Sequence, residues 1–232
     1  MKTPLTPARR RGIEILDNPA IDPALVKRAM RDVERANVMF GGRRAALIEL
    51  EPSLRAIRGT ATLLDVGIGR GDIAAAAQQR AATLGFTLTT IGVDNSHPIV
   101  SDHREANLLV VRSDALELPF ADGSVDIVLA SQLLHHFREP DAVALVREMN
   151  RVARTRVVIS DLRRSFIAAA GIWLGSFPLG FHPVSRHDGV VSVMRGFLSF
   201  ELADIVDKAT GKRPIVNQRL GFRLTTSWKP VR

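Results

Sequence analysis

The stretch LLDVGIGRGD, residues 63–72, has the pattern of a buried strand that runs into a glycine-rich turn and then into a helix. Gly67 and Gly69 permit positive φ angles and let a ligand approach the backbone, where the amides of the following helix point outward. The dinucleotide fingerprint G-x-G-x-x-G would require glycine at position 72, which is Asp72, so pyrophosphate binding is disfavoured. The Asp65 carboxylate also repels phosphate. The turn therefore predicts a site for a nucleotide-like ligand that is cationic or uncharged.

Short apolar segments alternate with helical patterns from this turn onward. Buried strands are predicted for residues 61–66, 87–93, 108–112, 125–130 and 156–161, and helices for residues 70–84 and 139–152. A further helix is expected around residues 200–209, and the segments 214–218 and 222–228 are close enough to pair as a hairpin. The alternation predicts an α/β fold: a Rossmann-like, doubly wound, mostly parallel sheet of about seven strands with a terminal antiparallel hairpin.

Two further regions flank or interrupt this alternation. Apolar residues at helical spacing predict helices over residues 23–36 and 43–57, with a break from Asn37 to Gly42. Residues 1–58 are therefore predicted to form an N-terminal helical arm, and residues 59–232 the main domain. The arm is expected to close over the ligand site, because it feeds toward the first strand. The insert of residues 162–197 contains a strongly apolar stretch and is predicted to form a helical lid.

The composition limits the class of protein. At 232 residues, with 46% hydrophobic and 24% charged residues, the chain is long enough for one well-formed core. It has no cysteine, which excludes disulfides, cysteine zinc sites and thiol nucleophiles. The basic N-terminus has no apolar run behind it, and the apolar stretch of the insert is shorter than the roughly 20 residues of a membrane span. A cytoplasmic protein without a membrane span is expected.

The pattern D-x-G-x-G-x-G from Asp65 to Gly71 resembles the first motif of the class I S-adenosylmethionine-dependent methyltransferases, whose cofactor contains no phosphate. Residues 90–96, 112–115, 116–126 and 130–137 resemble later motifs of this family, in the expected order. One departure lies before the fifth strand, where the family usually has a Pro-Gly-Gly turn and this chain has only Thr155. The resemblance covers about residues 60 to 162 and implies S-adenosylmethionine as the cofactor.

The resemblance also implies roles for individual residues. Asp94, which ends the second strand, corresponds to the carboxylate that accepts both ribose hydroxyls, and Asp114 with Ala115 corresponds to the segment that contacts adenine. Ser131 and Gln132 follow the fourth strand and face the methyl donor in the family. The predicted cofactor-binding residues are Asp65, Gly67, Gly69, Gly71, Asp94, Asn95, Asp114, Ala115, Ser131 and Gln132.

Methyl transfer to a hydroxyl group requires alignment, exclusion of water and removal of a proton. The candidate bases are His135 and His136, just beyond the fourth strand, and His187, which follows the apolar stretch. Asp161 ends the fifth strand and faces the same crevice. Each of these residues also has a purely structural interpretation, as part of a turn, a loop or a strand end. Histidines and carboxylates show no convincing ligand spacing, so no metal site is predicted.

The insert supplies large apolar side chains that could cover the crevice: Phe166, Ile172, Trp173, Leu174, Phe177 and Phe181. These side chains predict a lipophilic or aromatic small-molecule acceptor, although they could instead be core residues. Segments of the insert also resemble bacterial methyltransferases related to the ubiquinone and menaquinone biosynthesis enzymes. That weaker resemblance implies O- or C-methylation of a phenol-like molecule.

Two other functions stay open. The formal net charge of +8 suits a nucleic-acid partner, but it is equally compatible with an arginine-rich proteome. Methylation of base amino groups usually uses an Asn/Asp-Pro-Pro-aromatic motif, whereas this chain has Ser-Gln-Leu-Leu at residues 131–134. Nucleic acid is therefore disfavoured, with ribose methylation of RNA as its remaining form. The other alternative is a non-catalytic protein that binds the cofactor. The acceptor, the methylated atom and the oligomeric state are left open.

Overall fold

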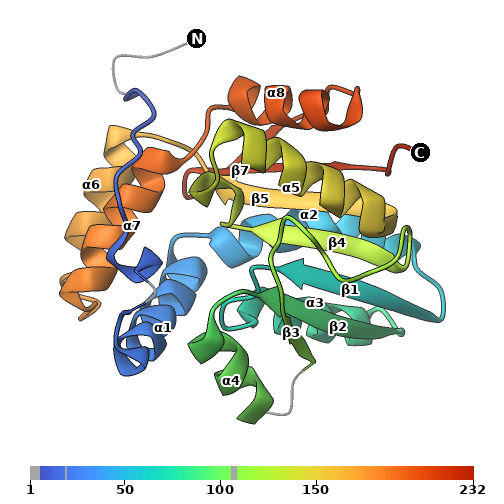
Figure 1. Cartoon of the computed structure of the whole chain (residues 1–232), viewed down its shortest axis with the longest axis horizontal. Helices are drawn as coiled ribbons and strands as arrows, with labels where there is room; N and C mark the ends of the chain where they lie inside the picture. Colours follow the sequence, from blue (N-terminus) through green and yellow to red (C-terminus); the bar gives the residue numbers. More distant parts are fainter. Residues whose placement is uncertain (1–5, 19, 106–108) are drawn as a thin grey trace.

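The computed structural model describes residues 6–18, 20–105 and 109–232. Its centre is a seven-stranded sheet in the order β3-β2-β1-β4-β5-β7-β6 (Figure 1). The strands are β1 (Thr60–Val66), β2 (Thr87–Asp94), β3 (Val110–Arg112), β4 (Val125–Ser131), β5 (Ala153–Leu162), β6 (Asn217–Arg219) and β7 (Arg223–Trp228). The first five strands pair in parallel, and β7 pairs antiparallel with both β5 and β6. The predicted α/β fold class, including the antiparallel hairpin, is confirmed.

Helices cover both faces of the sheet. They are α1 (Pro23–Met39), α2 (Gly42–Ala56), α3 (Asp72–Thr83), α4 (His97–Glu105), α5 (Glu139–Val152), α6 (Phe166–Gly175), α7 (Pro183–Arg195) and α8 (Ser199–Thr210). The apolar sides of α5 and α8 pack on one face, around Met149 and Leu202. Those of α2 and α3 pack on the other face, around Leu50 and Ala77. This two-sided cover is the doubly wound arrangement.

Most differences from the predicted boundaries arise at glycines. The first arm helix continues to Met39 because the chain reverses only at Gly41, which has a φ of 78°. The helix predicted from residue 70 begins at Asp72, because Gly71 has a left-handed conformation and precedes its first turn. The third strand begins at Val110, and position 108 of its predicted range lies outside the described residues. Helix α4 was not predicted from the sequence.

The insert after β5 folds as two helices, α6 and α7. They lie beside α1, on the left of the view in Figure 1. Across the described parts of the chain, no helix is both long and apolar enough to cross a membrane. The two helices of the insert form a helical layer at one end of the sheet, next to the carboxyl ends of the parallel strands.

The turn between β6 and β7 touches the turn between α1 and α2. Gly221 has a φ of 73°, and a Cβ atom at this position would clash with the carbonyl oxygen of Phe40. We expect Gly221→Ala to lower the free energy of unfolding by at least about 2 kcal/mol, because the substitution combines backbone strain with overpacking.

Chemical denaturation of the full chain measures this effect. Gly211→Ala is the matched control, because Gly211 has a φ of 70° but open space where its Cβ would be. It is expected to lose only about 1 kcal/mol. Equal losses in the two variants would contradict a tight contact between the arm and the hairpin.

Candidate active site

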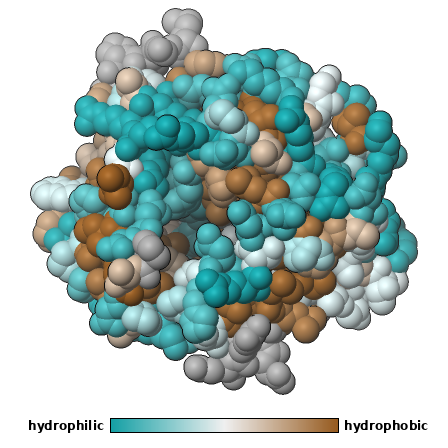
Figure 2. All heavy atoms as spheres, viewed as in Figure 1, coloured by the Kyte–Doolittle hydropathy of each residue, from teal (hydrophilic) through white to brown (hydrophobic). Residues whose placement is uncertain are grey.

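A cavity of about 1040 Å³ opens at the carboxyl ends of the parallel strands. Its walls come from the glycine-rich turn after β1, the ends of β2, β4 and β5, helix α1, and the insert helices α6 and α7. Residues 14 and 16–18 of the N-terminal segment contribute to the rim. Figure 2 shows the molecule hollowed between these parts. Ligands of open α/β sheets bind at this edge, so the cavity is the candidate active site.

The glycine-rich turn forms the floor of the cavity. Gly67, Gly69 and Gly71 all have positive φ angles, of 72°, 53° and 73°. The amides of Gly67 and Ile68 donate to the carbonyl oxygen of Val93 at 2.7 and 3.1 Å, which fixes the turn against β2. A Cβ atom at Gly67 would lie 2.8 Å from the Leu133 side chain. Glycine is therefore required for both conformation and space.

Asp94 lies at the end of β2, beside this turn. Its Oδ2 accepts from the Gly69 amide at 3.3 Å, and its Oδ1 accepts from the Ser96 amide at 2.9 Å. Burial raises the pKa of Asp94 above its ordinary value. The carboxylate lines the cavity together with Asn95, so it is positioned to accept hydrogen bonds from a ligand.

His135, which lines the cavity, forms a buried pair with Asp161. His135 Nδ1 lies 2.7 Å from Asp161 Oδ1, and both side chains are about 98% buried or more. Burial lowers the pKa of His135, so the ring is neutral near pH 7. Burial alone would raise the pKa of Asp161, but the interaction with His135 holds it below its ordinary value.

This pairing fixes which ring nitrogen of His135 can act as a base. With an ionised Asp161 accepting at Nδ1, the neutral ring carries its proton there, and Nε2 keeps a lone pair. Nε2 is buried and has no hydrogen-bond partner among the described residues. Asp161 thus orients the ring of a residue that lines the cavity and leaves a basic nitrogen unpaired, which is the arrangement of a general base.

His136 belongs to a second polar cluster at the rim. Its Nδ1 lies 3.6 Å from Asp17 Oδ1, 3.8 Å from Glu14 Oε2 and 3.2 Å from Arg195 Nη1. Burial opposes protonation, but Asp17 and Glu14 together raise the pKa of His136. His136 is therefore easier to protonate than its neighbour His135, whose ring centroid is 4.3 Å away.

The same rim contains a group of possible metal ligands that sequence spacing did not reveal. Ligand atoms of Glu14, His135 and His136 all lie within 4.8 Å of one another. Arg195 is paired with Glu14 at 3.0 Å and with Asp17 at 2.8 Å, so the carboxylates already have a cationic partner. The prediction that the chain has no metal site stays a prediction.

The comparisons with known proteins agree with this geometry. The family described as "Methyltransferase domain" matches residues 64–159, which include the glycine-rich turn, Asp94 and the His135 segment. This stretch of the chain is similar to the methyltransferase domain family, as the motif from Asp65 to Gly71 predicted. The cofactor that this family uses is S-adenosylmethionine, as the sequence motif implied.

Two curated relatives illustrate the similarity in sequence. An uncharacterized methyltransferase of Mycobacterium sp. (strain JLS) is 34% identical over 119 residues, or 51% of this chain and 42% of that protein. The uncharacterized methyltransferase Rv0224c of Mycobacterium tuberculosis (strain ATCC 25618 / H37Rv) is 33% identical over 116 residues, or 50% of this chain and 41% of that protein. The chain thus aligns with less than half the length of these relatives.

Solved structures extend the likeness to nearly the whole chain. An S-adenosylmethionine-dependent methyltransferase from Aquifex aeolicus superposes with a TM-score of 0.59 at 16% identity, covering 91% of this chain and 100% of that one. The mitomycin 7-O-methyltransferase MmcR superposes with a TM-score of 0.62 at 17% identity, covering 94% and 61%. At these identities the likeness concerns the fold alone.

The polar groups of this cavity fit the zwitterionic end of S-adenosylmethionine. Burial raises the pKa of Asp65 to about 8, with Asp72 and Asp94 adding to the effect, and burial also raises the pKa of Asp72. Asp72 Oδ2 is buried and unpartnered among the described residues. This concentration of carboxylates is relieved by a cation, and S-adenosylmethionine carries both a sulfonium and an ammonium group.

A complementary positive group lies a short distance away. Arg223 is 6% exposed and lines the cavity, and its buried Nε has no partner in the described part of the chain. Burial lowers its pKa to about 10. A Cβ atom at Gly42 would lie 3.3 Å from this Nε and 3.1 Å from Gln132 Nε2, so both groups meet at the N-terminus of α2. A helix N-terminus and a guanidinium together suit a carboxylate.

The structure brings together most, but not all, of the predicted cofactor-binding residues. Those that line the cavity are Asp65, Gly67, Gly69, Asp94, Asn95, Ser131 and Gln132. Gly71 instead faces His103, whose ring would lie 3.3 Å from a Cβ atom at this position. Asp114 and Ala115 follow β3 outside the cavity lining, and Asp114 Oδ1 accepts from the Leu116 amide at 2.9 Å. Their predicted contact with adenine stays a prediction.

His187 is not brought to the cavity. Its ring is half-exposed, and its Nδ1 lies 2.7 Å from Asp188 Oδ1. Asp188 in turn accepts from the amides of Ile15 and Leu16 at 2.8 and 2.9 Å. His187 therefore belongs to the contact that holds the N-terminal segment on α7, and not to the group of candidate bases.

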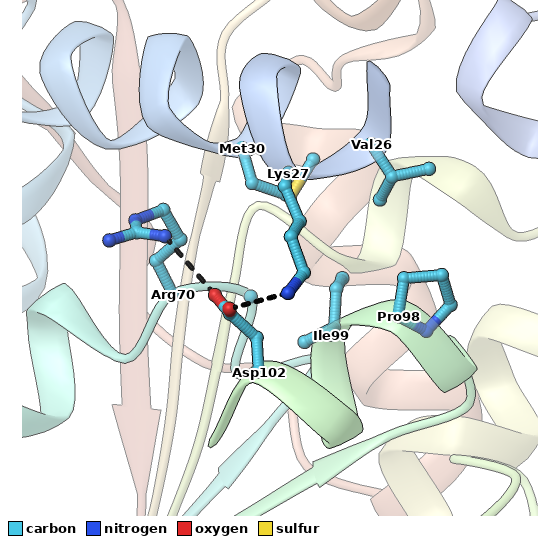
Figure 3. Close-up of a pocket in the computed structure, with 8 residues that line it drawn as sticks. Val26, Lys27, Met30, Arg70, Pro98, Ile99 and Asp102 are labelled. Carbon is cyan, nitrogen blue, oxygen red and sulfur yellow. Dashed lines mark hydrogen bonds and ion pairs between the residues drawn. The ribbon is translucent and has the colours of Figure 1, made fainter. Parts of the chain in front are cut away.

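Helix α1 of the predicted arm lies over the glycine-rich turn. Arg70, within that turn, pairs with Glu34 of α1 at 2.6 Å and with Asp102 of α4 at 3.4 Å. Figure 3 shows Asp102 between Arg70 and Lys27, a residue of α1 that lies 3.1 Å from it. These ion pairs support the expectation that the arm closes over the cofactor.

The large side chains of the insert correct one sequence-based expectation. Ile172 and Phe181 line the cavity, but Phe166, Trp173, Leu174 and Phe177 do not. These four are neither wall nor core, since their exposed fractions lie between 44% and 60%. Besides Ile172 and Phe181, the insert contributes Ile167, Ala168, Gly171 and Val193 to the apolar wall.

Proposed function

We propose that this chain transfers a methyl group from S-adenosylmethionine to an oxygen or carbon atom of a lipophilic, phenol-like small molecule, with His135 as the general base. The observation that carries the proposal is the buried Asp161–His135 pair: His135 lines the cavity, and its Nε2 is buried without a hydrogen-bond partner among the described residues. A phenol hydroxyl has a pKa near 10, so its proton must be removed for attack near pH 7. The phenolate is nucleophilic both at oxygen and at the adjacent ring carbons.

The cofactor supplies an electrophilic methyl group on a sulfonium. The chain's own residues position this group and remove the proton from the acceptor. Asp94 accepts hydrogen bonds from the ribose hydroxyls, Asp65 and Asp72 hold the ammonium group, and Arg223 with Gln132 holds the carboxylate. His135 Nε2 takes the proton, and Asp161 stabilises the resulting imidazolium through Nδ1.

The cavity wall supports an apolar acceptor of moderate size. The cavity is lined by Ile167, Ala168 and Ile172 of α6, by Val193 of α7, by Phe181 from the segment between these helices, and by Phe137. The enclosure under α6 and α7 also excludes water, which strengthens the interaction between Asp161 and His135. A long polynucleotide would have to displace this wall, so RNA is the less favoured acceptor.

Transfer of labelled methyl groups tests the acceptor class. The full chain is incubated with labelled S-adenosylmethionine and a lysate of the source cells, and label is counted separately in the organic-solvent extract and in purified RNA. We expect label in the extract, lost with Asp94→Ala because that variant cannot hold the ribose. Label confined to RNA would contradict the proposed acceptor, and label in neither fraction would favour a non-catalytic cofactor-binding protein.

A further inference from the structure

We propose that the outer face of α6 docks the protein on an anionic lipid bilayer. This inference rests on the proposed function only in one respect, namely that a lipophilic acceptor would then enter the cavity from the bilayer. Its starting point is the apolar surface left exposed by α6. The exposed side chains are Phe166 (44%), Ile167 (51%), Trp173 (49%), Leu174 (60%) and Phe177 (49%).

These side chains form one continuous face. Their spacing along α6 and the turn that follows corresponds to i, i+1, i+7, i+8 and i+11, which places them on the same side of a helix. Trp173 and Phe177 touch edge to face, with ring centroids 5.0 Å apart. Figure 2 shows apolar surface on the side of the molecule where α6 and α7 lie. Scattered apolar residues need no explanation, but a contiguous patch marks an interaction surface.

The rim of the patch is positively charged. The Arg186 guanidinium stacks 3.6 Å from the centroid of the Phe177 ring. Arg28 donates to the carbonyl oxygen of Gly180 at 3.0 Å, and the Arg35 guanidinium lies 5.5 Å from the Phe181 ring. Arg28 and Arg35 are about half-exposed. All three arginines therefore border the C-terminal end of α6.

One buried carboxylate offsets only part of this charge. Asp32, which is 1% exposed, lies 3.9 Å from Arg28 and 4.0 Å from Arg35, so two guanidinium groups share a single carboxylate. The same carboxylate also accepts from the His182 amide and the Ser185 hydroxyl. The sequence contains no Asp or Glu between Arg164 and Arg186. The chain as a whole carries a formal charge of +8. Apolar and aromatic side chains surrounded by arginines are complementary to the interface of a bilayer with anionic headgroups.

The opposite side of α6 explains what this docking would accomplish. Ala168, Gly171 and Ile172 line the cavity, and Ile167 lies at the border between the cavity and the exposed patch, so one helix separates the catalytic space from the proposed bilayer surface. A lipophilic acceptor would then pass around or beneath α6 without crossing water.

Binding of the full chain to vesicles tests the proposal without cofactor or acceptor. We expect sedimentation with phosphatidylcholine–phosphatidylglycerol vesicles to exceed that with pure phosphatidylcholine by at least about tenfold at low salt. Trp173 should show a blue-shifted fluorescence on binding, whereas Trp228 donates to Asn150 at 3.1 Å in the interior and should not respond. Leu174→Glu is expected to reduce vesicle binding by at least about tenfold with an unchanged melting temperature. Leu109→Glu is the matched control, because Leu109 is 62% exposed but directly precedes β3, at the edge of the sheet.

Three results would overturn the proposal. The first is no binding to either vesicle, and the second is equal binding to both. The third is a dimer of the free chain that Leu174→Glu dissociates, which would assign the patch to a second copy. Failure of the proposed function is distinguishable from each, because a chain that methylates nothing in the organic extract would still bind anionic vesicles.

Discussion

Replacing His135 with glutamine is expected to lower kcat for a hydroxyl acceptor by about 10²- to 10⁴-fold, the usual contribution of general base catalysis. Glutamine keeps a polar side chain of similar length, but it has no basic nitrogen. The dissociation constant for S-adenosylhomocysteine should stay within about twofold, because His135 is not among the residues proposed to hold the cofactor. Steady-state kinetics with the acceptor from the labelled extract, together with calorimetry, separate these effects.

Two further observations distinguish a base from a structural histidine. Asp161→Asn should also reduce kcat, because an amide in place of the carboxylate no longer fixes the proton on Nδ1. In the wild-type chain, kcat/KM should fall as the pH drops through the lowered pKa of His135, below its ordinary value of 6.5, since the protonated ring cannot accept a proton. His187→Gln, outside the cavity, should behave as wild type. Unchanged kcat in His135→Gln would assign the base to another group.

The fold and the cofactor motif could be predicted because their signals are local. The glycine-rich turn lies within one strand–turn–helix unit, and the alternation of apolar strands and helices has a regular period. Asp94 is placed by the same logic, since it ends the strand that pairs with β1. The boundaries shifted mainly where a glycine adopted a left-handed conformation, as at Gly71, and periodicity does not report φ angles.

The catalytic side could be predicted only in part, because its contacts join distant segments. His135 and Asp161 were both candidates, but their hydrogen bond spans 26 positions in the sequence. Glu14 contacts Arg195 across 181 positions, and no periodic pattern in the N-terminal segment marks it. The hydrogen bond from Gln132 to Asn37 also joins distant segments, since it spans 95 positions. Asp72 directly follows the D-x-G-x-G-x-G pattern and is not part of it, so the pattern does not mark it as a site residue.

The orientation of α6 shows a different limit of sequence reasoning. The helix is apolar on all sides, so its hydrophobic pattern has no period that selects a buried face. The sequence therefore favoured aromatic residues directed into the crevice. In the structure, small residues such as Ala169 face inward and pack against α7, and the larger side chains remain exposed. Close packing of the two insert helices requires small residues at their contact.

Replacing Arg223 with glutamine is expected to weaken binding of S-adenosylmethionine and S-adenosylhomocysteine by about 10- to 150-fold. Arg223 is a buried cation whose Nε is unpartnered, and a charge-assisted hydrogen bond to the methionine carboxylate contributes about 1.5–3 kcal/mol. Isothermal titration calorimetry with each ligand measures the effect. Arg223→Lys, which keeps the charge but not the planar fork, should recover only part of the affinity.

Decarboxylated S-adenosylmethionine identifies the group that Arg223 recognises. The wild-type chain should bind this analogue more weakly than the parent cofactor, whereas Arg223→Gln should bind the two within about threefold of each other, because the contact to the carboxylate is already lost. Arg213→Gln is the control, since Arg213 is half-exposed and pairs with Asp204 on α8, outside the cavity. If Arg223→Gln instead left cofactor affinity unchanged and raised KM for the acceptor, the unpartnered guanidinium would serve an anionic group of the acceptor. Binding of the cofactor carboxylate would then depend on Gln132 and the N-terminus of α2 alone.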